Sequence, residues 1–296
     1  MKQSTAIWPR VLPFGLYMAF LALESLLDFA SAWVPFLAES MALLPLWLYP
    51  IKIVVVLGAL LYNWDHYDEL HNKLCASLRE GVVTIGTGVV VYLAWVRMDW
   101  SWAMLGQGAG YNPWQAGASA GVLLAAVRLF GAAVVVPMME ELFWWSFLLR
   151  FVITLFPEEK TNVTNEFTSI PLGMFTPISF IVTVVLFGSE HTLWLAGMMA
   201  GALYNLLLYK TRRLWPCVLA HGVTNLLLGV HVLVRQEWQW WQGLLTPALK
   251  ERAGESRESL QPKKPARRGV LSRCAGPCSG GPIVPPSSPG QGVHAQ

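Results

Sequence analysis

The sequence predicts an all-α, polytopic transmembrane bundle of about eight helices, and three observations support this prediction. Of the 296 residues, 54% are hydrophobic and only 13% are charged, which is about half the charged fraction of an ordinary soluble domain. Mean hydropathy is positive, at +0.45, as expected for a chain whose solvent is largely lipid. The fifteen tryptophans suit the membrane–water interface.

Eight apolar runs are candidate spans. They cover residues 7–27, 43–62, 81–96, 118–138, 141–156, 175–187, 194–209 and 215–234. All are expected to be helices, because an open strand cannot satisfy its backbone in lipid and none of the runs alternates like a barrel strand. Gly197 and Gly201 form a GxxxG pair, which permits close packing of the seventh helix.

Three regions are expected: transmembrane helices over residues 1–116, a helical core that holds the chemistry over 117–240, and a tail over 241–296. The tail is basic and rich in Pro, Gly and Ser, so we expect it to be disordered. Binding of anionic lipid by the tail is an alternative. Much of the basic excess behind the net charge of +3 lies there, so it bears on orientation and predicts no nucleic-acid partner. Both termini are predicted to be cytoplasmic, although the basic residues 210–213 then lie outside, against the positive-inside rule.

The clearest polar group in an apolar run is the pair Glu140 and Glu141, which follows Pro137. Charged side chains inside a bilayer are costly and persist where they face a cavity or one another. Pro137 suits the start of a helix or a kink. Two interpretations stay open: the acids line a buried pocket, or they cap the fifth helix at a loop.

Two imidazoles lie in later apolar runs. His191 follows Phe187 by four residues, and His221 precedes Asn225 by four, so each pair shares a helix face. Imidazole suits proton transfer near neutral pH, and an amide can donate to a developing oxyanion. Hydrogen bonding between helices is the alternative for each pair. Together with the glutamates, these residues form the components of a buried hydrolytic site.

In this order, the groups resemble the motifs EExxxR, FxxxH and HxxxN of the CAAX protease and bacteriocin-processing family, also called CPBP or Abi. The resemblance covers roughly residues 128–230. It implies a glutamate-dependent intramembrane endopeptidase in which Glu140 or Glu141 activates water, His191 and His221 assist, and Asn225 stabilises the oxyanion.

The resemblance also implies where such an enzyme works. Membrane lipid and a lipidated or membrane-anchored peptide or protein are the expected partners, and no cofactor or metal is expected. Eukaryotic members cut prenylated CAAX proteins, whereas many bacterial members have other substrates. The short loops favour a bacterial inner membrane.

One position departs from the family motif: its arginine is replaced by Trp145. Arg150 lies about 180° around the helix from Glu141 and is no simple replacement. Arg128, on the preceding span, is a candidate partner for the glutamates. The departure leaves a catalytically impaired member that binds membrane peptides as an alternative.

Two further alternatives come from the same residues. Two His and two Glu suit zinc, but the sequence lacks HExxH, and Glu190 and His191 are adjacent, which does not present two ligands on one helix face. An ion-coupled transporter also buries carboxylates, but no internal repeat is seen.

Overall fold

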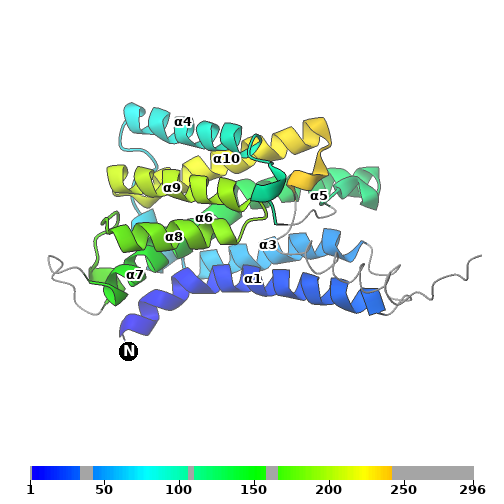
Figure 1. Cartoon of the computed structure of the whole chain (residues 1–296). Coiled ribbons are helices and arrows are strands. Elements are labelled where there is room, and N and C mark those ends of the chain that lie inside the picture. The colour runs from blue at the N-terminus through cyan, green and yellow to red at the C-terminus, as the bar shows by residue number, and fades with distance from the viewer. Residues whose placement is uncertain (1, 34–42, 106–109, 158–165, 242–296) are drawn as a thin grey trace, which may run out of the picture. The chain divides into compact units, whose positions relative to one another are not determined.

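A computed structural model of the chain describes residues 2–33, 43–105, 110–157 and 166–241. These residues form helices joined by turns and short 3-10 segments, without a β-strand among them, so the all-α prediction is confirmed (Figure 1). The α-helices are α1 (Lys2–Trp33), α3 (Leu44–Tyr62), α4 (Leu78–Trp95), α5 (Ala118–Phe130), α6 (Val136–Glu141), α7 (Leu149–Leu155), α8 (Pro177–Ser189), α9 (Trp194–Thr211) and α10 (Leu214–Arg235). The predicted tail lies outside the described residues, apart from Trp241.

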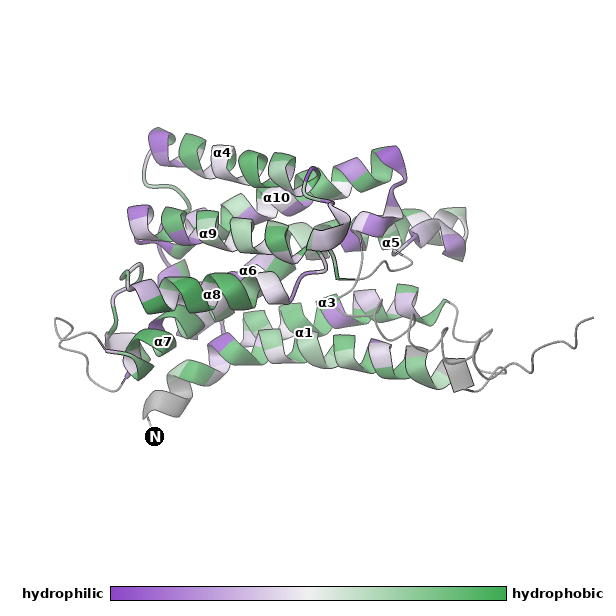
Figure 2. Ribbon diagram, viewed as in Figure 1, coloured by the Kyte–Doolittle hydropathy of each residue, from purple (hydrophilic) through white to green (hydrophobic). Residues whose placement is uncertain are grey.

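Five helices in the described part are long and apolar enough to cross a membrane. They are Ala6–Leu27 within α1, α3, α4, the run Ala118–Leu155, and α10. Helix α8 is apolar but shorter, and Figure 2 shows hydrophobic residues along most of it. Large apolar side chains such as Val54 and Val82 are exposed, as lipid-facing positions require. The polytopic membrane architecture is confirmed, but the count of eight spans is not.

The fourth and fifth predicted spans are one helical run, Ala118–Leu155, which corrects the expected break between them. The run passes from α5 through a π-helix, η5 (Gly131–Val135), into α6, through a second π-helix, η6 (Leu142–Leu148), and into α7. Pro137 lies just after η5 and does not end the helix. A π-helix at this point accommodates the irregular hydrogen-bond pattern that a proline causes inside a helix.

The long run lies at the centre of the described helices. Helix α10 packs against α4, α9 and the η5–α6 part of the run, α8 packs against α9, and α1 packs against α3 and η6. The buried core is built largely from the inward faces of α3, the long run, α9 and α10. This packing places the glutamate pair of the run beside α10.

Helices α8 and α9 approach closely at glycines, as the GxxxG pair predicts. A Cβ atom on Gly197 would lie 3.0 Å from the Cα of Gly188 and 3.1 Å from Nδ1 of His191, and one on Gly201 would lie 3.1 Å from the Phe187 ring. These separations are tighter than ordinary van der Waals contact. The small residues of α9 therefore set the position of His191.

The variant Gly197→Ala is expected to destabilise the protein by about 1–3 kcal/mol, because its methyl group overpacks the contact with Gly188. Gly86→Ala in α4 is the matched control, since nothing lies within 4 Å of a Cβ atom there, and alanine is the better helix former. Thermal unfolding in detergent measures both. Equal midpoints for the two variants would show that the α8–α9 contact is not tight.

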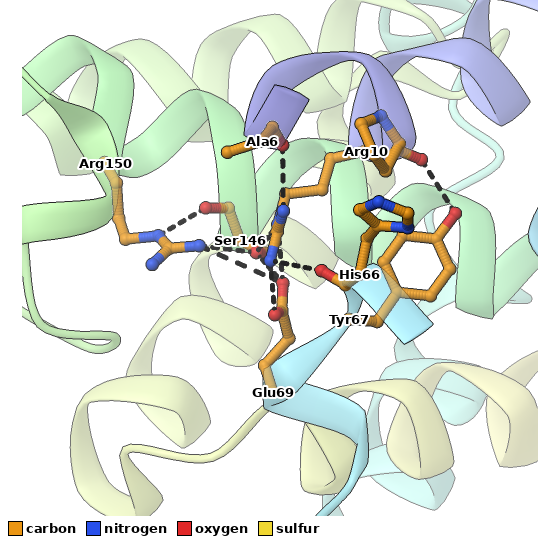
Figure 3. A network of polar contacts seen from close by, with 8 residues as sticks. Ala6, Arg10, His66, Tyr67, Glu69, Ser146 and Arg150 are labelled. Atoms are coloured by element: carbon orange, nitrogen blue, oxygen red, sulfur yellow. Dashed lines mark hydrogen bonds and ion pairs between the residues drawn. The ribbon is translucent and has the colours of Figure 1, made fainter. Parts of the chain in front are cut away.

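A buried charged network fixes α1 to the long run (Figure 3). Arg10 donates from Nε and Nη2 to the two carboxylate oxygens of Glu69, at 2.8 and 2.6 Å. Ser146 donates its hydroxyl to the same carboxylate, and Nη2 of Arg150 lies 3.9 Å from it. Tyr67 donates to the Pro9 carbonyl at 2.7 Å. One carboxylate thus lies between two buried guanidinium groups.

Burial raises the pKa of Glu69, but the hydrogen bond and positive charge of Arg10 outweigh it, so this pKa lies below its ordinary value. A carboxyl whose pKa is lower in the folded state stabilises the fold above its unfolded pKa and loses that contribution as pH falls.

We therefore expect wild type and Glu69→Gln to differ most in thermal unfolding midpoint at neutral pH. The difference should shrink as pH falls below about 4.5, the ordinary pKa of a glutamate side chain. Detergent-solubilised protein scanned from pH 7 downward measures this. A difference that stays constant, or grows on acidification, would show that Glu69 is not ionised in the folded protein.

Candidate active site

Four of the five residues predicted to do chemistry line one cavity of about 160 Å³. Glu140, His191, His221 and Asn225 all border it, and so does Glu190. They come from three separate parts of the fold: the long run, the segment after α8, and α10. The fifth predicted residue, Glu141, is fully buried directly behind this group. The structure thus brings four of the five predicted side chains to one cavity and joins the fifth, Glu141, to them through His221.

The glutamate pair lies at the end of α6, in the middle of the long run. Glu140 is 6% exposed and Glu141 is 0% exposed. The alternative that they cap a helix at a loop is wrong, because the helical run continues to Leu155. One oxygen of each carboxyl group, Oε2, has no hydrogen-bond partner among the described residues. A buried, unpaired carboxylate oxygen is costly unless it serves a ligand or a water molecule.

His221 joins the two glutamates. Its Nδ1 lies 2.9 Å from Oε1 of Glu141, within hydrogen-bond distance, and its Nε2 lies 3.9 Å from Oε2 of Glu140. The second separation is too long for a direct hydrogen bond and short enough for one water molecule to contact both atoms. Tyr204 stacks on the imidazole, with ring centroids 5.2 Å apart, and donates to the Thr224 hydroxyl. Glu141 and Tyr204 therefore fix the orientation of His221.

His191 lies just beyond the end of α8, and Nδ1 of its ring lies 2.7 Å from the Phe187 carbonyl oxygen. A carbonyl only accepts, so Nδ1 carries the proton and Nε2 of the neutral ring is an acceptor. The Phe187 ring packs against both imidazoles, with centroids 4.9 Å from His191 and 6.2 Å from His221. Phe187 thus forms an apolar wall between the two histidines.

Asn225 donates from Nδ2 to the carbonyl oxygen of Ala132 at 2.8 Å. This bond joins α10 to the π-helix η5. An amide nitrogen carries two N–H groups, so one remains for a ligand in the cavity that Asn225 borders. The predicted donor is thus partly engaged in holding two helices together.

The position of the missing family arginine is filled by a fully buried ring. Trp145 lies one turn after Glu141, and its indole N–H has no hydrogen-bond partner among the described residues. Arg150 turns away to Ser146 and Glu69, as its place on the helix predicts. Arg128 borders the cavity but makes no ion pair with Glu140 or Glu141 among the described residues.

Instead of pairing with the glutamates, Arg128 lies among aromatic rings. Its Cζ atom is 4.2, 5.1 and 5.9 Å from the ring centroids of Tyr49, Tyr111 and Trp241, distances typical of cation–π contacts. The hypothesis that Arg128 replaces the family arginine is therefore wrong in this structure. His221, not a guanidinium, is the group paired with Glu141.

Three side chains at the cavity are close enough to hold a metal ion. One ligand atom from each of Glu140, Glu190 and His191 lies within 4.8 Å of the other two. The expectation that adjacent Glu190 and His191 cannot present two ligands is corrected here. It assumed a helix, but α8 ends at Ser189, and both side chains turn to the cavity.

Sequence reasoning set Glu190 aside as a ligand and missed the residues that hold the site in place. Glu190 accepts a hydrogen bond from the Trp144 indole N–H at 3.0 Å. The available signal was its place directly before His191, at the end of an apolar run. Tyr204 gave no comparable signal, because a single tyrosine in an apolar helix is indistinguishable from core packing.

Comparison with known proteins agrees with this geometry. Residues 122–227 match the family model described as type II CAAX prenyl endopeptidase Rce1-like. The match spans just over a third of the chain and includes the glutamate pair, both histidines and Asn225. No curated protein and no solved structure matches the chain significantly. The family match confirms the resemblance to CAAX proteases and supports a peptidase embedded in the membrane.

Proposed function

We propose that the protein is a glutamate-dependent intramembrane endopeptidase of the CAAX-protease type. The observation that supports this best is the 3.9 Å separation between Oε2 of Glu140 and Nε2 of His221, two groups that one water molecule can contact together, at a cavity that His191 and Asn225 also border. A membrane-anchored or lipidated peptide is the proposed substrate, with the site in a bacterial inner membrane and both termini in the cytoplasm.

The chemistry follows from the donor and acceptor capacity of each group. Glu140 takes one proton from the water as its oxygen attacks the peptide carbonyl carbon. Asn225 is the one neutral N–H donor among the five predicted residues whose second hydrogen is free for the oxyanion. When the C–N bond breaks, the proton held by Glu140 passes to the leaving nitrogen, which restores the carboxylate.

The other three residues support that step. Glu141 accepts the Nδ1 hydrogen of His221 and so keeps Nε2 facing the water next to Glu140. His191 offers Nε2 as a second acceptor at the cavity, because its Nδ1 is bound to the Phe187 carbonyl. The hydrogen bond with His221, and not a cation from position 145, holds Glu141 in place.

The direct test is cleavage by purified wild-type protein in proteoliposomes. The probes are a farnesylated peptide with a CAAX end, the same peptide without the lipid, and a transmembrane peptide. Mass spectrometry locates the new carboxyl end. Cleavage of at least one anchored peptide is expected, and the unlipidated soluble peptide serves as the control. Failure to cut any probe under conditions in which the protein is folded and inserted would contradict the proposal.

A zinc-dependent hydrolase is a second candidate, favoured by the cluster of Glu140, Glu190 and His191. Four ligands, one of them water, are usual for catalytic zinc. Metal analysis of the purified protein and assay after treatment with 1,10-phenanthroline separate the two. The glutamate mechanism expects full activity without bound metal. Stoichiometric zinc together with loss of activity on chelation would favour the metal mechanism.

A further inference from the structure

We infer that Asn225 is a positioning residue, which supplies the hydrogen bond that Pro137 cannot make and thereby holds the glutamate-bearing helix in its π-helical form. This inference deepens the proposed function, because it concerns the same site and the same reaction. It gives Asn225 a role that its place in the HxxxN motif does not predict.

The hydrogen-bond pattern of η5 identifies the missing donor. In a π-helix each carbonyl accepts from the N–H five residues later, and the N–H of Val136 bonds to the Gly131 carbonyl in this way. The next bond in the series would join the Ala132 carbonyl to residue 137. Residue 137 is proline, which has no N–H. The Ala132 carbonyl therefore has no backbone donor in this register.

Asn225 fills this gap from another helix, 93 positions away in the sequence. Its Nδ2 donates to Ala132 O at 2.8 Å. The approach depends on Gly222, one turn earlier on α10, where a Cβ atom would lie only 2.7 Å from the Ala133 carbonyl oxygen. Two successive carbonyls of η5 thus face α10, one in contact with a glycine and the other hydrogen-bonded to the amide.

The helical form of η5 sets the direction in which the glutamate side chains after it point. A π-helix contains more residues per turn than an α-helix, and each residue turns an α-helix by about 100°. If η5 relaxed by one residue, Glu140 and Glu141 would turn by about that angle away from His221. The Asn225–Ala132 bond and the His221–Glu141 bond link the same two helices and fix their relative register.

A double-mutant cycle tests this inference. Asn225→Leu keeps the side-chain shape but removes the donor, and Pro137→Ala restores a backbone N–H for the Ala132 carbonyl. Asn225→Leu is expected to lower the thermal unfolding midpoint by about 3–6 °C in the wild-type background. In the Pro137→Ala background we expect a loss of less than about 1 °C, because the carbonyl is then paired by the backbone. Equal losses in both backgrounds would overturn the inference.

The same four proteins separate positioning from direct oxyanion binding. At a temperature at which all are folded, Asn225→Leu should lower kcat by more than about 10²-fold with KM unchanged. Pro137→Ala should restore the part of that loss caused by the altered helical register and leave the part caused by the missing oxyanion donor. A loss of kcat that Pro137→Ala does not restore at all would assign Asn225 to the oxyanion alone. The unfolding measurement needs no substrate, so it decides the inference even if the proposed protease activity is wrong.

Discussion

Replacing Glu140 by glutamine is expected to lower kcat for peptide cleavage by at least about 10³-fold. Glutamine keeps the size of the side chain but cannot take a proton from water, and general base catalysis contributes about 10²–10⁴-fold. The nearest imidazole, His221, has its Nδ1 held by Glu141 and its Nε2 3.9 Å from Glu140. In the proposed mechanism it orients this water and takes no proton from it. Mass-spectrometric assay of cleaved peptide measures the change.

The matched control for Glu140→Gln is Glu166→Gln, which removes an exposed carboxylate outside the cavity. This control should retain wild-type kcat. Thermal unfolding should be unchanged or slightly raised in Glu140→Gln, because a buried charge with an unpaired oxygen is removed. Retention of more than a tenth of wild-type activity by a folded Glu140→Gln protein would exclude Glu140 as the base.

Loss of Glu69 is expected to destabilise the protein by about 3–5 kcal/mol, the largest stability effect of any single change considered. Glu69→Gln leaves two guanidinium groups unpaired, on Arg10 and Arg150, which are 4% and 8% exposed. Removing one member of a buried ionic network costs this much because the remaining charges stay desolvated. Denaturation in mixed detergent, compared with wild type at neutral pH, measures the loss.

A second ion pair gives the control for this effect. Arg213 and Glu80 are joined at 2.6 Å, but their side chains are 19% and 14% exposed, and a single guanidinium is involved. Glu80→Gln should therefore cost clearly less than Glu69→Gln. Similar losses for the two variants would show that burial of the Arg10–Glu69–Arg150 network adds nothing. The network links α1 to η6, so its loss is also expected to make α1 more accessible to protease.

The sequence allowed the membrane class, the helical fold and the main site residues to be predicted, because each depends on local chemistry. Apolar length identifies a span, and an ionisable residue in such a run is rare enough to indicate a site. On that ground, and on the order of the three motifs, Glu140, His191, His221 and Asn225 were expected to meet, and the structure places all four at one cavity. Their catalytic roles remain predictions.

The break expected near Pro137 was wrong for a tertiary reason. Proline normally ends or bends a helix because one carbonyl loses its donor. Here Asn225 supplies a donor from α10, and a π-helix absorbs the irregularity. Neither compensation is visible in the residues around Pro137, so two spans were predicted where the structure has one run.

The partners of two arginines were also only partly predicted, again because those partners are distant in sequence. Arg150 was correctly separated from the glutamates by helical geometry, but its contact with Glu69 could not be foreseen. Arg128 was a candidate partner for the glutamates and instead lies over Tyr49 and Tyr111. A guanidinium accepts either a carboxylate or an aromatic face, and only the packing of α3 against the long run decides between them.

The central claim is that a water molecule activated by Glu140 attacks the peptide bond directly. A single-turnover reaction of wild-type protein with an anchored peptide in water enriched in oxygen-18 tests it. One labelled oxygen is expected in the new carboxyl group of the product, and none in the Glu140 side chain after digestion of the enzyme. An unlabelled product together with label in Glu140 would reveal a covalent glutamyl intermediate and contradict the account.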